Sequence, residues 1–548
     1  MSAPAFLRRL EALRLDHGAA AIAAKRAALA GLAGARFGNA DLLLRYHEIL
    51  CKMAAYPDGR AQLAAVRHEL RGFARRVDLA RFRDQLADSG IAGTATGYNF
   101  FWMMGRYLAA RFPRRYRINW EAPEFDARLK AALPLLLPWH EAEAVKRSTM
   151  PTRAIIERVR GRSSDAVFVA QAIERIAGDS FVREHVHDSI DCAYVLTPAG
   201  GNPSRTLAQH RAAPLVYCEA SPAPTPIDLN SALARRPRGV RRAGVKEARA
   251  LIELAREAML TRSRDLAAFS WGDERDVMVV DDGAGLAFAL IGSLPERRLP
   301  LPVAHGWVML RNRVPVGYVQ TDSLLAGSEV AFNVFPTFRG VEAGHLFSRV
   351  LATARHLLGA RAFSIEPYQL GVGNNEAIDS GAWWFYYKLG FRPTEAGPQR
   401  LLARELARMK KRPAHLSSAP TLKGLAAGHM VYEPEQGRRA WLPLMPDLGL
   451  ARRWASEPAP TQAALRRLGA GSDARWPGDE RQAWERLAPI VLALPGVDAW
   501  SANDKRAAVA ALRAKGGVRE SDFLRRVDAH APLATALQRL LGARRRRP

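Results

Sequence analysis

Cysteine and long apolar runs are both scarce in this sequence. Only Cys51, Cys192 and Cys218 occur among its 548 residues. Three scattered cysteines cannot build a disulfide framework, so we expect a reducing compartment and a cytoplasmic protein. No apolar stretch approaches the ~20 residues of a membrane-spanning helix, and residues 1–15 lack the uninterrupted apolar segment of a signal peptide. We therefore expect no membrane partner.

Acidic residues are fewer than basic ones. The chain has 54 Asp and Glu against 81 Lys and Arg, which gives a formal net charge of +27. This charge favours non-specific contact with polyanions at low salt, and a basic nucleic-acid-associated protein is one hypothesis. No helix-turn-helix, zinc-finger or RNA-binding sheet motif appears, and the arginines are spread over many Ala-rich helices. Paired His/Cys clusters with ligand spacing are also missing, so we predict no metal site.

The length and the pattern of apolar residues indicate three regions. Residues 1–233 are mainly helical in pattern and carry no motif that names a role. A Pro-rich connector at 220–226 and a basic hinge at 235–242 separate them from a mixed strand and helix region at 245–435. Residues 440–548 are again helical and basic, and they end in four arginines at 544–547. The longer predicted helices cover 41–53, 59–73, 97–112, 123–137, 166–177, 461–468, 478–494, 502–514 and 520–541.

The central region contains the most informative order of elements. A helix is predicted around 248–259, followed by strands at 276–280, 286–291, 307–310 and 316–319. A further strand at 329–335 places Glu329, Ala331 and Asn333 on one face. It then enters a helix at 346–358 through Arg339-Gly340. Such a turn leaves backbone N–H groups at the helix start facing outward, an arrangement suited to a pyrophosphate.

This order of parts resembles the GNAT superfamily of N-acetyltransferases, which use acyl-CoA. The family turn is Arg/Gln-x-x-Gly-x-Gly/Ala; Arg339 and Gly344 match it, whereas Glu342 stands at the central Gly. The insertion between the family's last two motifs is about five residues, more than one helical turn, so we predict a loop at 379–381 and a helix that starts near Ala382. The residues that match those two motifs are Asn374, Ala377, Ile378, Tyr386, Gly390 and Phe391.

The resemblance implies an α/β (α+β) fold with a GNAT-like mixed twisted sheet, flanked by helical regions. It implies an acyltransferase that moves an acetyl or other acyl group from acyl-CoA to an amine acceptor. Tyr386 would protonate the departing thiolate, and either Glu329 or Glu366 would act as the base. Asn374 would hydrogen-bond the pantetheine arm. The cofactor residues implied by the resemblance are Val334, Arg339, Gly340, Val341, Ala343, Gly344 and Asn374.

Glu342 is the main departure from the family pattern. A carboxylate at this position brings bulk and negative charge toward the place of an anion. Either the turn shifts so that Gly340 serves, or cofactor binding is weak or lost. The alternative hypothesis is therefore a catalytically inactive binding or scaffold protein with the same fold.

Overall fold

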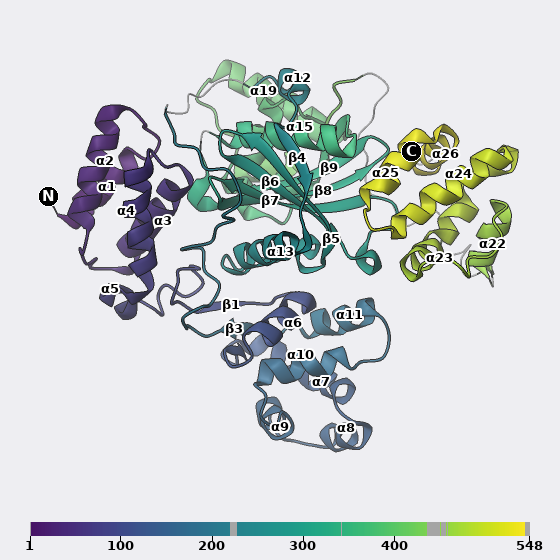
Figure 1. The fold of residues 1–548 in the computed structure, drawn as a ribbon, viewed down its shortest axis with the longest axis horizontal. Helices are drawn as coiled ribbons and strands as arrows, with labels where there is room; N and C mark the ends of the chain where they lie inside the picture. The colour runs from purple at the N-terminus through teal and green to yellow at the C-terminus, as the bar shows by residue number, and fades with distance from the viewer. Residues whose placement is uncertain are drawn as a thin grey trace.

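A nine-stranded sheet lies at the centre of the computed structural model, and helical regions surround it (Figure 1). The structure describes residues 2–219, 227–340, 342–435, 450, 456–457 and 459–542. The connector at 220–226, Val341 and the arginines at 544–547 lie outside these ranges. The mixed sheet with helices confirms the expected α/β class. In the described ranges, no helix combines the length and apolar character needed to cross a bilayer.

The central sheet has the strand order β11-β12-β10-β9-β8-β7-β6-β5-β4. Its neighbouring strands are antiparallel, except for β9 and β10, which are parallel. All the strands predicted from 276 to 335 are present. The bounds are β4 (Gly239–Arg242), β5 (Gly272–Gly283), β6 (Leu286–Ser293), β7 (Val303–Arg311), β8 (Val314–Leu324), β9 (Gly327–Val334), β10 (Ala362–Ile365), β11 (Arg392–Pro393) and β12 (Met430–Tyr432).

Strand β4 corrects the prediction of a basic hinge. Residues 239–242 pair antiparallel with β5, from Gly239 opposite Asp281 to Arg242 opposite Met278. All four residues are exposed because β4 is the edge of the sheet, and charged residues are common on such edges. Their polar composition therefore resembled that of a linker. The sheet begins before residue 245, the predicted start of the central region.

Helices lie on both sides of the sheet, with α13 on one side and α15 on the other (Figure 1). Helix α15 buries the apolar face that the sequence predicted, including Leu346, Phe347, Val350 and Leu351. The predicted loop before residue 382 is present but shorter than 379–381, because Asp379 is the last residue of α17; Gly381, with a φ of +66°, then separates α17 from α18. The bounds are α12 (Leu229–Ala234), α13 (Val245–Leu260), α14 (Ala267–Ser270), α15 (Ala343–Leu358), α16 (Pro367–Leu370), α17 (Asn375–Asp379), α18 (Ala382–Lys388), α19 (Ala396–Lys411) and α20 (Ala419–Leu425).

The N-terminal region divides into two units with different hydrophobic cores. The first unit lies beside the central sheet and shares its hydrophobic core (Figure 1). Its helices are α1 (Ala3–Ala12), α2 (Ala19–Leu32), α3 (Ala40–Ala55), α4 (Arg60–Gly72) and α5 (Val77–Arg81).

The second unit has a core of its own, which reaches the central region through Leu260 and Trp271. The helix predicted at 97–112 is shorter than expected, because its first residues form a strand. The bounds are β1 (Thr96–Tyr98), α6 (Trp102–Arg111), β2 (Tyr116–Ile118), α7 (Asp126–Leu136), α8 (Trp139–Lys146), α9 (Thr152–Val159), α10 (Asp165–Glu174), α11 (Ser180–Ile190) and β3 (Tyr194–Leu196).

The C-terminal helices pack at the end of the sheet opposite to the first N-terminal unit (Figure 1). The helix predicted at 520–541 breaks into two at His530, because Pro532 cannot donate the backbone hydrogen bond that a continuous helix would need there. Lys515 anchors this region: its buried amine donates to the Pro302 carbonyl at 2.6 Å and pairs with Glu520 at 2.5 Å. The bounds are α22 (Pro460–Arg467), α23 (Gly478–Ala493), α24 (Ala502–Arg513), α25 (Ser521–Ala529) and α26 (Ala531–Gly542).

Candidate functional site

A polar cleft opens where β9 and β10 separate. The parallel pairing runs from Ala362 opposite Gly327 to Ser364 opposite Glu329 and stops there. Beyond Glu329, β9 stays paired with β8 only, as far as Val334. The cleft has a volume of about 460 Å³. A strand that loses one neighbour leaves backbone N–H and C=O groups free to meet a ligand.

The inner wall of the cleft comes from two paired strands. Alternation along β9 places Glu329, Ala331 and Asn333 on this wall, in agreement with the face predicted from the sequence. The register with β8 puts Asp322 opposite Glu329. Glu366 follows the last residue of β10 and lines the same cleft. Both candidate bases therefore face one space.

The carboxyl groups of this wall influence one another. Burial raises the pKa of Asp322 to about 7, and the charges of Glu329, Glu520 and Glu366 act in the same direction. Burial and the charge of Glu329 also raise the pKa of Glu366. The side chain of Glu329 is 12% exposed, and its Oε2 lies 3.6 Å from Nε2 of His429. Carboxylates crowded in this way are stabilised by a cation and gain affinity for a proton.

The outer end of the cleft contains a cation that is already engaged. Arg264 pairs with Glu376 at 2.7 Å and donates to the Tyr318 hydroxyl at 3.2 Å. Glu376 also forms an ion pair with Arg339, and these two partners lower its pKa despite burial. The charge of Arg264 is therefore already balanced by a carboxylate of the protein.

Asn374 caps a helix and also lies at the edge of the cleft. Its side-chain oxygen caps α17 by accepting from the Ala377 amide at 3.2 Å. Its amide nitrogen donates to the Tyr368 carbonyl at 3.2 Å, and the residue lies at the edge of the cleft. The cap explains its local conformation, and the cleft gives it access to a ligand.

Tyr386 does not line the cleft. It is 3% exposed and packs against Phe347 on α15, with ring centroids 5.4 Å apart, and against Phe391. Burial raises the pKa of its hydroxyl, and the nearby charge of Glu366 adds to this shift, so the hydroxyl keeps its proton at neutral pH. Its neighbour Tyr387 stacks on Trp383 instead.

The turn between β9 and α15 is the candidate phosphate site. Arg339 does not point outward from it, because its Nε donates to the Val334 carbonyl at 3.0 Å while the guanidinium also pairs with Glu376. Gly340 has a φ of +150°, a conformation that favours glycine. Ala343 opens α15 and donates to the Gly340 carbonyl at 3.2 Å. Helix α15 has no side-chain cap hydrogen bond at its N-terminus.

Glu342 occupies this turn. Its carboxylate pairs with Arg311 at 3.3 Å, and both side chains are largely buried. Helix α3 covers the turn from the other side, where Lys52 donates to the Arg339 carbonyl at 3.4 Å. Ile227 covers Gly344 so closely that a Cβ there would lie 2.6 Å from its Cδ1. Entry of a pyrophosphate therefore requires the Glu342 side chain and these covering groups to move.

Sequence reasoning missed Tyr318, Asp322 and Arg264 in the cleft. Strand β8 carries polar residues at every second position, Tyr318, Gln320 and Asp322, and this alternation was a usable signal. Arg264 follows a helix that is distant in the chain, so no local pattern could place it here.

Comparisons with family models, curated proteins and solved structures find no significant match to this chain.

Proposed function

We propose that the protein is an N-acyltransferase that binds a protonated amine in the cleft between β9 and β10 and acylates it from acyl-CoA. The observation that supports this most is the separation of β9 from β10 beside Glu329 and Glu366. It leaves one edge of β9 without a strand partner beyond Glu329, and carboxylates lie in the same space.

The carboxylates account for both binding and deprotonation of the amine. A cationic amine gains Coulomb attraction from Asp322, Glu329 and Glu366, which is stronger in a partly buried site than in water. Glu329 or Glu366 first takes one proton from the ammonium group, which frees the nitrogen lone pair to attack the thioester carbonyl. The C–N bond forms and the C–S bond breaks; the nitrogen gives up its second proton as the amide forms, and the leaving thiolate gains one proton, so that one proton in all stays on the carboxylate. Tyr386 is the donor that the GNAT resemblance implies, and because it is buried against Phe347 and Phe391 outside the cleft, this role requires its hydroxyl to become accessible to the thiolate.

Acyl-CoA would place its pyrophosphate at the N-terminus of α15. That end of the helix carries backbone N–H groups and lies near Lys52 and Arg311. The proposal requires the Glu342 carboxylate to leave Arg311, so that a phosphate replaces it as the partner of the arginine.

A second candidate is a binding protein without transferase activity. The pairing of Glu342 with Arg311 and the cover of Ile227 over Gly344 favour it, because together they fill the turn with the protein's own groups. The cleft would then bind a cationic ligand without a reaction.

Titration of the full chain with acetyl-CoA in a calorimeter tests the two candidates. The transferase predicts binding by the native protein, and tighter binding by Glu342→Gly, because the variant removes the competing carboxylate. It also predicts acetyl-CoA-dependent release of free thiol in the presence of a panel of primary amines. Glu435→Gly serves as the control. It also removes a carboxylate from an ion pair, the one with Arg355 at 2.8 Å, but this pair lies away from the turn. Absence of binding by both the native chain and Glu342→Gly at millimolar acetyl-CoA would exclude the transferase.

A further inference from the structure

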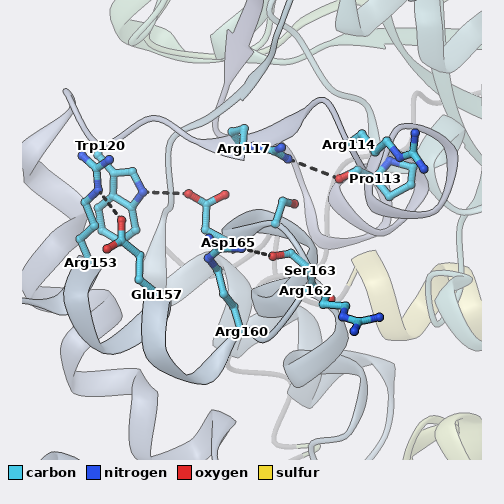
Figure 2. Close-up of a pocket in the computed structure, with 11 residues that line it drawn as sticks. Pro113, Arg114, Arg117, Trp120, Arg153, Glu157, Arg160, Arg162, Ser163 and Asp165 are labelled. Carbon is cyan, nitrogen blue, oxygen red and sulfur yellow. Dashed lines mark hydrogen bonds and ion pairs between the residues drawn. The ribbon is translucent and has the colours of Figure 1, made fainter.

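A basic pocket lies in the second N-terminal unit and shares no lining residue with the cleft. It has a volume of about 300 Å³ and is formed around the start of α10 (Figure 2). The lining includes Arg114, Arg117, Arg153, Arg160 and Arg162. These arginines come from the loop before β2, from β2 itself, from α9 and from the loop between α9 and α10. The fold therefore gathers cations from separate segments.

The carboxylates of this pocket are already engaged. Asp165 accepts from the Trp120 indole at 2.8 Å (Figure 2). It also accepts from the Ile118 amide at 3.1 Å. Glu157 accepts from Arg153 at 3.1 Å. Two acids therefore face five arginines, and the excess positive charge is left for a partner.

Several of the arginines serve the local structure, whereas two do not. Arg117 donates to the Tyr116 carbonyl at 3.1 Å, and Arg160 donates to the Ser163 carbonyl at 2.5 Å. Arg114 and Arg162 are exposed, and their side chains form no hydrogen bond or ion pair within the described residues. Keeping such side chains together without partners costs Coulomb energy, which an anion would offset.

The pocket continues into two further depressions. The first shares Pro113 and Arg114 with it, adds Arg111 and Arg115, and has a volume of about 490 Å³. The second shares Gly200 and Gly201 with the first, adds Arg75 and Arg83, and has a volume of about 420 Å³. Asp and Glu are missing from the lining of both depressions, which the structure describes in full. The three depressions form a basic track.

We propose that the basic track binds the sugar–phosphate backbone of a nucleic acid. A single phosphate would need one pocket, whereas successive cationic depressions suit an anion with repeated charges. Arginine is suited to this role because its planar guanidinium forms paired hydrogen bonds with phosphate oxygens. The net charge of +27 favours encounter with such a polyanion. Contacts to the backbone alone give binding without sequence preference.

Fluorescence anisotropy of a labelled single strand of about 20 nucleotides with the full-length protein tests this proposal. We expect binding at ~50 mM salt that weakens steeply as salt is added. The double variant Arg114→Ala/Arg162→Ala should raise the dissociation constant by about tenfold. In a plot of the logarithm of the binding constant against the logarithm of the salt concentration, the magnitude of the slope should fall by about 1.4, or ~0.7 for each lost phosphate contact. Both side chains are exposed and unpartnered, so the melting temperature should stay unchanged.

The control is Arg36→Ala/Arg481→Ala, which removes the same charge at two exposed arginines outside the track. It should leave affinity and salt dependence as in the native chain. Arg83→Ala changes the other end of the track, so it should weaken binding of the strand of about 20 nucleotides. A strand of about four nucleotides bound near Arg114 is too short to reach Arg83, so its affinity should stay the same.

Three results would overturn the proposal. The first is no binding of the strand at ~50 mM salt, and the second is an equal loss of affinity in the double variant and in its control. The third is binding of poly-glutamate as tight as that of the strand, with the same dependence on Arg114 and Arg162. None of these outcomes depends on acyl-CoA, so the proposed transferase stands or fails separately.

Discussion

Replacing Arg349 by Met should strongly destabilise the central region. Arg349 lies on α15 and is almost fully buried, with Nε 2.7 Å from Oδ2 of Asp282 and Nη2 2.7 Å from Oδ1. It also donates to the Ala232 carbonyl at 3.1 Å and the Arg235 carbonyl at 2.9 Å. Helix α15, β5, α12 and the residue that follows α12 therefore meet at one guanidinium. Its loss leaves the Asp282 carboxylate buried with only the weaker contact to Arg235 at 3.3 Å.

Removing one partner of a buried ion pair costs about 3–5 kcal/mol. For a cooperative region of roughly 200 residues, each kcal/mol lowers the melting temperature by about 2–4 °C, so we expect a decrease of about 6–20 °C. Differential scanning calorimetry at neutral pH measures it. Arg355→Met is the matched control on the same helix, because Arg355 is partly exposed and pairs with Glu435 at the surface, where loss of the pair costs under about 1 kcal/mol.

A mutant cycle separates the ion pair from the packing of the arginine stem. Asp282→Asn combined with Arg349→Met should destabilise less than the sum of the two single variants, with a coupling of about 1–3 kcal/mol. The reasoning is refuted if Arg349→Met lowers the melting temperature no more than Arg355→Met does.

Three further predictions concern other buried charges. Asp322 has a folded-state pKa of about 7 against an ordinary value of 3.8, so the folded protein holds this proton more tightly and loses stability as the pH rises between these values. Asp322→Asn should remove this loss. The melting temperature of the variant should therefore exceed that of the native chain by a margin that grows up to pH ~7. Glu366→Gln should lower kcat/KM for amine acetylation by about 10²–10⁴-fold if Glu366 is the base, and Glu329→Gln should do so if the base is Glu329, with acetyl-CoA affinity unchanged in each case. Lys515→Met should leave the carboxylate of the buried Glu520 with only Arg298 as an ion-pair partner, at 4.0 Å. The variant should therefore release the C-terminal helices faster during trypsin digestion. Lys505→Met, at a partly exposed residue of α24, should not change the rate of this release.

The strands around the cleft were predictable because their signal is local. Alternation of polar and apolar residues placed Glu329 and Asn333 on one face, and β9 shows them there. Gly381 marked the break before α18, because a residue with positive φ is most often Gly. The break at Pro532 was equally local and was overlooked.

The state of the phosphate turn was not predictable from local pattern. Glu342 could be recognised as an unusual residue, but its partner Arg311 lies on β7 and its covering groups come from α3 and from Ile227. Contacts between distant segments leave no periodicity in the sequence. Strand β4 shows the same limit, because only its pairing with β5 distinguishes it from a basic linker.

The separate interior of the second N-terminal unit has a consequence for evolution and engineering. Apart from Leu260 and Trp271, the side chains buried in that interior come from within the unit itself. Exchange of the whole unit would nevertheless reach the cleft, because Tyr98 of β1 lines it and Glu184 of α11 pairs with Arg297 and accepts from the Trp271 indole at 3.2 Å. The exposed side chains of Arg114 and Arg162 lie outside these contacts, so this surface can diversify while the cleft is preserved.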